Sequence, residues 1–205
     1  MTRLQFTTRF FKPAAFLAAL GPAAWLGLGV LGRVDLGADP VKTFQVTTGL
    51  TTLVLLLVTL TISPARKILH WSELIRLRRM LGLFAFFYVL SHALIYFILD
   101  QSLDPSLIWE DTIKHPRIAV GFIAFLILIP LAITSTDRMI RRLGKRWGRL
   151  HKLIYLATAL GILHYLMVQK LDLREGLVYG GVFALLMLWR VPWRRLVSPA
   201  APREV

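Results

Sequence analysis

The sequence contains no cysteine. This absence excludes disulfide bonds, Cys-ligated zinc, iron–sulfur clusters held by Cys and catalytic thiols. A metal bound by this chain must therefore use histidine or carboxylate ligands, or arrive inside a cofactor that supplies ligands of its own.

Charged residues are scarce and unevenly placed. They make up 18 % of the chain, whereas hydrophobic residues make up 56 %. The charges gather between long apolar runs, and no Asp, Glu, Lys or Arg falls in the middle of a run. Runs of about 18 or more apolar residues are typical of membrane spans. Because no polar stretch is long enough to bury a separate soluble core, the sequence predicts one membrane domain over residues 1–205.

Six membrane-spanning helices are expected, at residues 14–31, 44–63, 80–99, 118–136, 150–169 and 177–193. At about 1.5 Å rise per residue, a run of about twenty residues covers the roughly 30 Å hydrocarbon core. The sixth run is the weakest, because Arg190 interrupts it. Pro22 predicts a kink in the first run. No internal repeat is evident. The predicted fold class is an all-α membrane protein, a six-transmembrane-helix bundle.

The basic residues fall mainly on one side of this bundle. The N-terminus, the second and fourth loops and the C-terminus hold 19 of the 25 basic residues but only three of the 11 acidic ones. Cytoplasmic loops carry the excess of Lys and Arg, so both termini are expected in the cytoplasm. The net charge of +14 is therefore interpreted as a topology signal and a contact with anionic lipid. Nucleic acid is not an expected partner.

Two histidines lie deep inside apolar runs, His92 in the third span and His164 in the fifth. A histidine at this depth is costly and by default a functional candidate. Both lie about 20 Å from the cytoplasmic side, and their spans are parallel, so the two rings can face each other. Two neutral imidazoles placed in this way can ligate a b-type haem from both faces. The structural alternative is that each one only hydrogen-bonds to a neighbouring helix.

A third histidine, His151, lies at the cytoplasmic entrance of the fifth span, about 20 Å along the axis from the deeper histidine of that span. This separation suits a second, inner haem, but the matching depth on the third span holds Arg78 and Arg79. Arginine suits haem propionates or a flavin phosphate, so these two are candidates for such contacts. The alternative for His151 is an interfacial residue without a ligand. His70 and His115 are expected to be solvated loop residues.

Two segments resemble the MsrQ (YedZ) family, within the ferric-reductase-like transmembrane family: RRMLGLFAFFYVLSHALIYFILD and WGRLHKLIYLATALGILHY. The resemblance covers essentially the whole chain. It implies one transmembrane haem domain, which serves as the electron-transfer subunit of an oxidoreductase complex and is not its catalytic subunit. The implied axial ligands of the haem iron are His92 and His164, with His151 at the inner position. The resemblance implies one or two b-type haems, and FMN is a further cofactor associated with the family.

The resemblance also implies partners and a location. Electrons would come from the quinone pool or a flavin reductase on the cytoplasmic side of the bacterial inner membrane. They would pass to MsrP, a periplasmic molybdopterin enzyme that repairs oxidised methionine in proteins. Independently of the resemblance, the acidic charge of the third loop makes the stretch from Asp100 to Asp111 the candidate docking surface for the acceptor.

Two alternatives stay open. The first is a transmembrane ferric reductase, or another haem b reductase with a different acceptor. The second belongs to another class, a proton or metal transporter that uses the histidines as a relay. Transporters of that class usually add carboxylates inside the membrane, and this chain has none in the middle of a span.

Overall fold

The computed structural model describes residues 2–169 and 172–191, and these residues form helices and connections with no strand among them. The first membrane helix is continuous through α1 (Arg3–Phe6), the π-helical segment η1 (Thr7–Phe11) and α2 (Lys12–Val30). The next elements are α3 (Pro40–Ile68), the short 3-10 helix η2 (Ser72–Leu74), α4 (Ile75–Ile95) and the π-helical segment η3 (Tyr96–Asp100). They are followed by α5 (Pro105–Lys114), α6 (Pro116–Ile133), α7 (Asp137–Leu143), α8 (Lys145–Leu150), α9 (Leu153–Val168) and α10 (Arg174–Leu188).

Five of the described helices are long and apolar enough to cross a membrane: Arg3–Val30, Pro40–Ile68, Ser72–Asp100, Pro116–Ile133 and Lys145–Val168. They coincide with the first five predicted spans, which confirms an all-helical, multi-pass membrane protein. The sixth predicted span coincides with α10, which has 15 residues. A helix of that length covers only about 22 Å. The end of that span and the C-terminal arginines lie outside the described residues, so the sixth crossing and the cytoplasmic termini stay predictions.

Proline and aspartate set the starts of the helices at the loops. Proline occupies the first turn of α3, α5 and α6, where its missing N–H has no helical partner to lose. Asp39 caps α3 by accepting a hydrogen bond from the backbone N–H of Lys42 (3.0 Å). Asp104 caps α5 in the same way, and hydrogen bonds from the Ser106 hydroxyl and backbone lower the pKa of its carboxyl. The caps fix where each helix turns back into the bundle.

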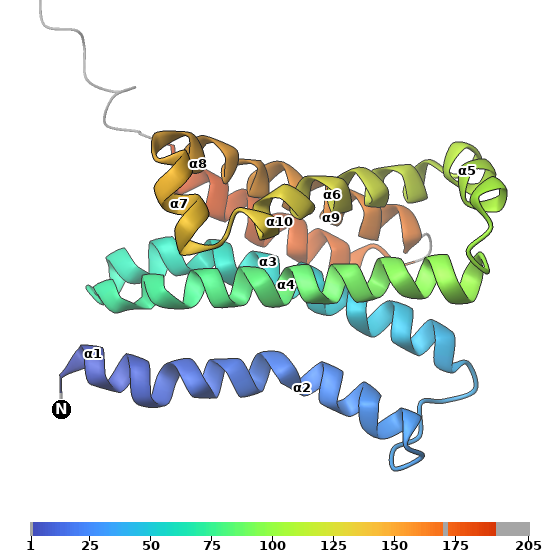
Figure 1. Ribbon diagram of the computed structural model, residues 1–205, viewed down its shortest axis with the longest axis horizontal. Helices are drawn as coiled ribbons and strands as arrows, with labels where there is room; N and C mark the ends of the chain where they lie inside the picture. The colour runs from blue at the N-terminus through green and yellow to red at the C-terminus, as the bar shows by residue number, and fades with distance from the viewer. Residues whose placement is uncertain (1, 170–171, 192–205) are drawn as a thin grey trace, which may run out of the picture.

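The helices pack as two antiparallel pairs. The α3 helix packs mainly against α4, and α6 packs mainly against α9. The pairs meet through α4 and α6 and also through α3 and α9, while the first helix lies along the outside of the α3–α4 pair (Figure 1). The start of α1 lies at the same end as α7 and α8, and α5 lies at the opposite end (Figure 1). We call the first the basic end and the second the acidic end, after the charges of their loops.

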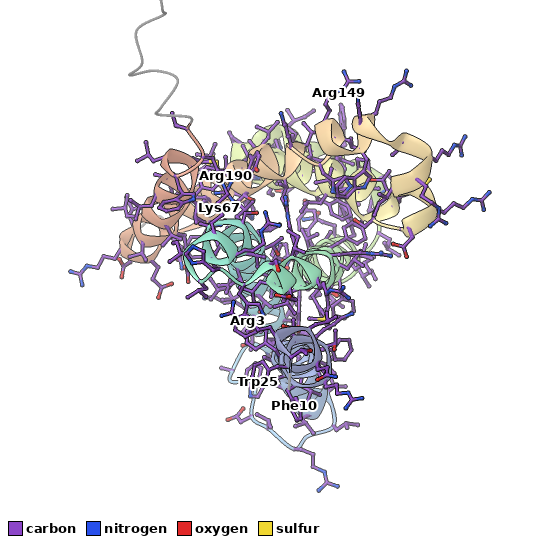
Figure 2. The ribbon with its side chains drawn as sticks, turned by 90° about the vertical axis from the view of Figure 1, so that its left-hand side faces the viewer. Arg3, Phe10, Trp25, Lys67, Arg149 and Arg190 are labelled. Carbon is purple, nitrogen blue, oxygen red and sulfur yellow. The ribbon has the colours of Figure 1, made fainter. Side chains whose placement is uncertain are left out.

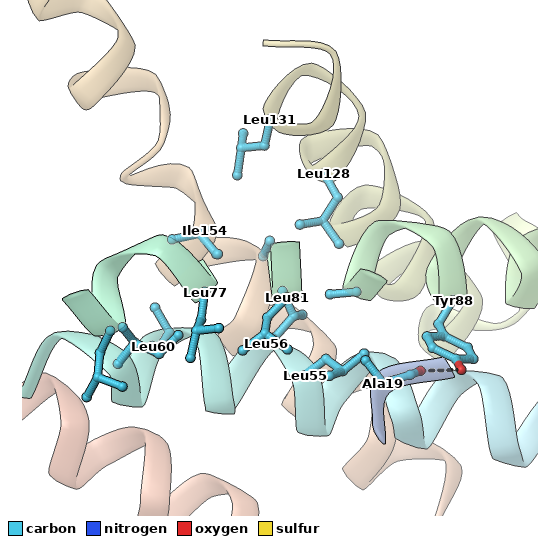
Figure 3. Close-up of a cluster of buried hydrophobic side chains, with 14 residues drawn as sticks. Ala19, Leu55, Leu56, Leu60, Leu77, Leu81, Tyr88, Leu128, Leu131 and Ile154 are labelled. Atoms are coloured by element: carbon cyan, nitrogen blue, oxygen red, sulfur yellow. Dashed lines mark hydrogen bonds between the residues drawn. The ribbon is translucent and has the colours of Figure 1, made fainter. Parts of the chain in front are cut away.

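The core lies between the two pairs and is almost entirely aliphatic (Figure 3). Most of its buried side chains come from α3, α4, α6 and α9, among them Leu56 and Leu60, Leu77 and Leu81, Leu128 and Leu131, and Ile154 and Ala157, while α2 adds Ala19. Its largest member is Tyr88 of α4, which is 1 % exposed. The Tyr88 hydroxyl donates to the carbonyl of Ala19 (2.7 Å) and accepts from the N–H of Ala23 (3.0 Å). A regular helix would pair these two backbone groups with each other, so Tyr88 ties α2 to α4 next to Pro22.

Replacing this hydroxyl should loosen the first helix. In Tyr88→Phe, the buried carbonyl of Ala19 and the partly buried N–H of Ala23 lose the hydroxyl as a partner, and a buried group left unsatisfied costs about 1–3 kcal/mol. We expect a clear drop in the thermal unfolding midpoint of the detergent-solubilised protein. The matched control is Tyr155→Phe, because the Tyr155 ring contacts Arg190 but its hydroxyl has no hydrogen-bond partner among residues 2–169 and 172–191. Equal midpoints for the two variants would contradict the role given to Tyr88.

Candidate functional site

The rings of His92 and His164 face each other in the half of the bundle nearer the acidic end. His92 lies on α4 and His164 on α9, two helices that run in the same direction (Figure 1). The two ring centres are 6.2 Å apart, and the ring planes are nearly perpendicular, at 81°. The structure therefore brings together the two histidines that the sequence pairs by depth.

A backbone carbonyl on a neighbouring helix orients the His92 ring. The Nδ1 atom of His92 lies 3.0 Å from the carbonyl oxygen of Gln45 on α3. A carbonyl can only accept, so Nδ1 carries the proton and Nε2 keeps its lone pair. Gly49 stands one turn further along α3, and a Cβ atom built there would be 3.0 Å from Cε1 of His92. Any other residue at position 49 would place its Cβ so close that the His92 ring would have to shift.

The same arrangement recurs around His164. Its Nδ1 atom lies 2.7 Å from the carbonyl oxygen of Arg117 on α6. A Cβ atom at Gly121, one turn further along α6, would be 2.7 Å from that nitrogen. Each imidazole is therefore oriented by a backbone carbonyl and lies against a glycine. Its Nε2 atom is the ring nitrogen that stays available to a metal.

The separation of the two rings fits an iron held between them. A metal–imidazole bond is about 2 Å long, and the ring adds roughly 1 Å on each side, so two axial imidazoles of one haem have centres roughly 6 Å apart. The observed separation is 6.2 Å. Next to His92, the side-chain oxygen Oε1 of Gln45 is buried with no hydrogen-bond partner among the described residues. A buried acceptor of this kind calls for a partner, which a bound group can supply.

The two half-sites repeat at a constant offset of 72 residues. Three pairs of positions share this offset: Gln45 and Arg117, Gly49 and Gly121, and His92 and His164. Ala85 and Ala157, which are both fully buried, follow the same offset. The pairs α3–α4 and α6–α9 are thus equivalent hairpins that meet at the two imidazoles. The side chains differ at most other equivalent positions, which is why the repeat is not evident in the sequence.

His151 lies away from this pair, at the basic end, where α8 ends and two residues before α9 begins. Its Nε2 atom is 3.1 Å from the hydroxyl of Thr134, and the ring of Trp147 stacks on it at 4.0 Å. The Trp147 indole N–H in turn donates to the carbonyl of Thr134 (3.0 Å). The described residues place no second imidazole against His151.

The arginines of the predicted inner site have different surroundings. Arg79 occupies the position equivalent to His151 in the repeat and forms a salt bridge with Asp137 (2.5 Å). Arg78 is near enough to His151 to interact with it electrostatically. Among the described residues, the structure therefore places Arg78, but no second imidazole, beside the inner histidine.

The remaining two histidines are loop residues, as predicted, and within the described part of the chain only the imidazole of His115 has a side-chain partner. The Nδ1 atom of His115 lies 2.6 Å from Asp111, which also accepts hydrogen bonds from Tyr96 (2.8 Å) and Gln101 (3.1 Å). His70 is exposed and has a positive φ of 48°. The network around Asp111 fixes the start of α6 and therefore the turn that holds Arg117.

The acidic residues of the predicted docking loop all have partners inside the chain. Asp100 accepts from the side chain of Gln45 (3.2 Å), Asp104 caps α5, and Glu110 pairs with Lys114. With Asp111, this gives each of the four acids a structural contact. Removing all four charges together would disturb this loop as well as any partner that binds it.

Sequence reasoning found the ligand candidates but not what orients them. Gly49, Gly121 and the two carbonyls carry no chemical signal of their own. The one signal available in the sequence was spacing, because His92 follows Gly49 at the same interval as His164 follows Gly121.

Comparisons with known proteins agree with this geometry. The family described as "Ferric reductase like transmembrane component" matches residues 46–162, which cover most of α3, α4, α6 and α9 and include His92 but end before His164. Similar curated proteins are named "Protein-methionine-sulfoxide reductase heme-binding subunit MsrQ". That of Rhodospirillum rubrum is 47 % identical over 95 % of this chain and 94 % of its own length. That of Xanthomonas campestris pv. campestris is 48 % identical over 94 % and 95 %, and that of Caulobacter vibrioides is 45 % identical over 91 % and 90 %. No solved structure matches the chain. The chain therefore belongs to the ferric-reductase-like transmembrane family and, within it, to the MsrQ family.

Proposed function

We propose that this protein is a haem b electron-transfer subunit that serves a methionine sulfoxide reductase. The observation that carries the proposal is the pair of imidazole rings 6.2 Å apart, each with Nδ1 tied to a backbone carbonyl. The names of the similar proteins, which state heme binding and a methionine sulfoxide reductase, support it. Bound between the rings, haem b supplies one-electron redox chemistry.

The residues of the chain prepare the site for that group. The carbonyls of Gln45 and Arg117 fix one tautomer of His92 and His164, which leaves Nε2 as the ligand atom. These hydrogen bonds also make Nε2 a stronger metal ligand, because each carbonyl polarises the N–H at Nδ1 of the same ring. Gly49 and Gly121 let each ring lie against the neighbouring helix. The aliphatic core between the hairpins keeps water and ions away from the site.

The charge asymmetry supports a direction for electron transfer. The basic end carries most of the Lys and Arg and would face the cytoplasm under the positive-inside rule. The paired histidines would then lie nearer the periplasm, close to the proposed acceptor, MsrP. Quinone or a flavin reductase would be the donor at the cytoplasmic face. The location that follows is the bacterial inner membrane.

The inner position remains part of the proposal. His151, with Arg78 and Arg79, is the candidate site for a second haem or for the phosphate of FMN. Thr134 and Trp147 now contact His151, so a ligand at its Nε2 would replace the contact with the Thr134 hydroxyl. A chain with one haem would use the outer pair alone.

Electron delivery in proteoliposomes tests the proposal. The protein is reconstituted, its haem is reduced, and purified MsrP with a methionine sulfoxide peptide is added in the absence of oxygen. We expect the reduced absorption band to disappear only when both enzyme and sulfoxide are present. The matched control omits the peptide and keeps MsrP.

The same assay separates the alternatives. Reoxidation by ferric citrate at a similar rate, with none by MsrP, would favour a ferric reductase and overturn the choice of acceptor. Uptake of a divalent metal into liposomes by haem-free protein would favour the transporter.

A further inference from the structure

A cavity opens at the basic end, between the start of the first helix and the connection from α3 to α4. It has a volume of about 470 Å³ and is lined by Thr2, Arg3, Phe6, Leu69 and Trp71. It lies far from the paired histidines and takes no part in the proposed electron transfer. Figure 2 looks onto this end and shows Arg3 beside the end of α3, with Lys67 on the same face.

One wall of the cavity is cationic. The guanidinium of Arg3 donates one hydrogen bond, to the carbonyl of His70 (2.7 Å). Its remaining N–H groups have no acceptor among the described residues. The planar fork of arginine suits the oxygens of a phosphate. The single bond to His70 therefore orients the group and leaves it able to bind an anion.

The other wall is apolar and rigid. The indole N–H of Trp71 donates to the hydroxyl of Thr7 (2.9 Å), and the ring packs against Phe6 at 5.9 Å and Phe11 at 5.7 Å. Leu69 at the rim is 58 % exposed. Tryptophan is enriched where a protein crosses the boundary between headgroups and acyl chains. This wall is thus suited to the glycerol and upper acyl region of a lipid.

The apolar wall continues into the lipid-facing surface of the first helix. Phe10 and Leu17 follow Phe6 along this helix and are 57 % and 66 % exposed. A ligand in the cavity with an acyl tail can therefore lay that tail along the same helix. A water-soluble anion would use the Arg3 wall only.

We infer that this cavity binds the headgroup of an anionic phospholipid from the leaflet at the basic end. The phosphate would lie against Arg3, and the glycerol and first methylenes against Trp71 and Phe6. The positive charge of this end, which holds most of the basic residues of the chain, is complementary to an anionic lipid. The lipid would fasten the start of the first helix to the α3–α4 connection, two segments joined here by Arg3 and Trp71.

Native mass spectrometry of the full chain tests this site. The protein is released from nanodiscs that contain equal amounts of phosphatidylglycerol and phosphatidylcholine, and the retained lipids are counted. We expect one phosphatidylglycerol to be retained in preference to phosphatidylcholine. Arg3→Gln should weaken its retention about fivefold, the effect of about one basic residue at a membrane surface. The matched control is Arg9→Gln, which removes an exposed arginine of the same helix outside the cavity.

A second variant keeps the test meaningful if Arg3→Gln is unstable. Arg3→Lys keeps the charge but loses the fork, so we expect retention between those of the wild type and Arg3→Gln, at an unchanged size-exclusion profile. Equal retention in Arg3→Gln and Arg9→Gln would overturn the inference. Displacement of the lipid by millimolar glycerol phosphate would also overturn it, because it would show that a soluble anion is sufficient.

Discussion

His92→Ala and His164→Ala should each abolish the low-spin haem b spectrum of the purified protein. Each substitution removes one of the two nitrogen atoms that would hold the iron, and the opposite ring cannot replace it from 6.2 Å away. Changes to groups that only orient a metal ligand already cost roughly 10–100-fold in affinity, so loss of a ligand should cost more. The measurement is the reduced-minus-oxidised spectrum with haem quantitation per chain.

Two further histidines serve as controls for this result. His70→Asn should leave the spectrum unchanged, because His70 is an exposed loop residue and Asn tolerates its positive φ. His151→Ala should keep the outer haem and lower the haem count only if an inner haem exists. An unchanged spectrum in His164→Ala would contradict the assignment of His164 as a ligand of the haem iron.

Gly121→Ala should reduce haem occupancy by about tenfold to a hundredfold while leaving the helix bundle folded. The added Cβ would be 2.7 Å from Nδ1 of His164, closer than real Cβ contacts allow. The ring must then move away from the Arg117 carbonyl, which lies 2.7 Å from the same nitrogen. Overpacking of this kind costs about 1–3 kcal/mol. Haem quantitation and the midpoint potential report the change, because ligand orientation affects both.

The other glycines provide a graded comparison. Gly49→Ala should have a smaller effect, because its Cβ would be 3.0 Å from the His92 ring. Gly82→Ala on α4 should have no effect on haem binding, since among the described residues no atom beyond its own helix turn lies within 4 Å of the added Cβ. The same change should stabilise the helix by up to about 1 kcal/mol. If Gly82→Ala lowered occupancy as much as Gly121→Ala, the contact with His164 would not be the cause.

The membrane helices could be predicted from the sequence because hydrophobic run length is a strong signal. Each of the first five predicted spans lies within or close to an observed helix, and the observed helices extend beyond the apolar run at most ends. At the start of α3 the extension has a visible cause, since Asp39 caps the helix and Pro40 starts it. Loop elements such as α5 were not predicted, because a ten-residue amphipathic helix has no comparable signal.

The candidate site was predictable only in part. The depth of His92 and His164 along two parallel spans was enough to pair them, because rise per residue is nearly constant in a helix. Their carbonyl partners and glycine contacts depend on which helices pack together, which hydropathy does not encode. Cross-helix contacts, such as that of Tyr88 with Ala19 and that of His151 with Thr134, escaped prediction for the same reason.

Electron paramagnetic resonance of the oxidised, purified protein tests the central claim most directly. Two imidazole nitrogens on one ferric haem give a low-spin signal, and labelling the histidines with ¹⁵N should change its nitrogen couplings. We predict a low-spin signal that depends on both His92 and His164. A high-spin, five-coordinate signal, or a low-spin signal that persists without either histidine, would contradict the pairing of the two rings across one iron.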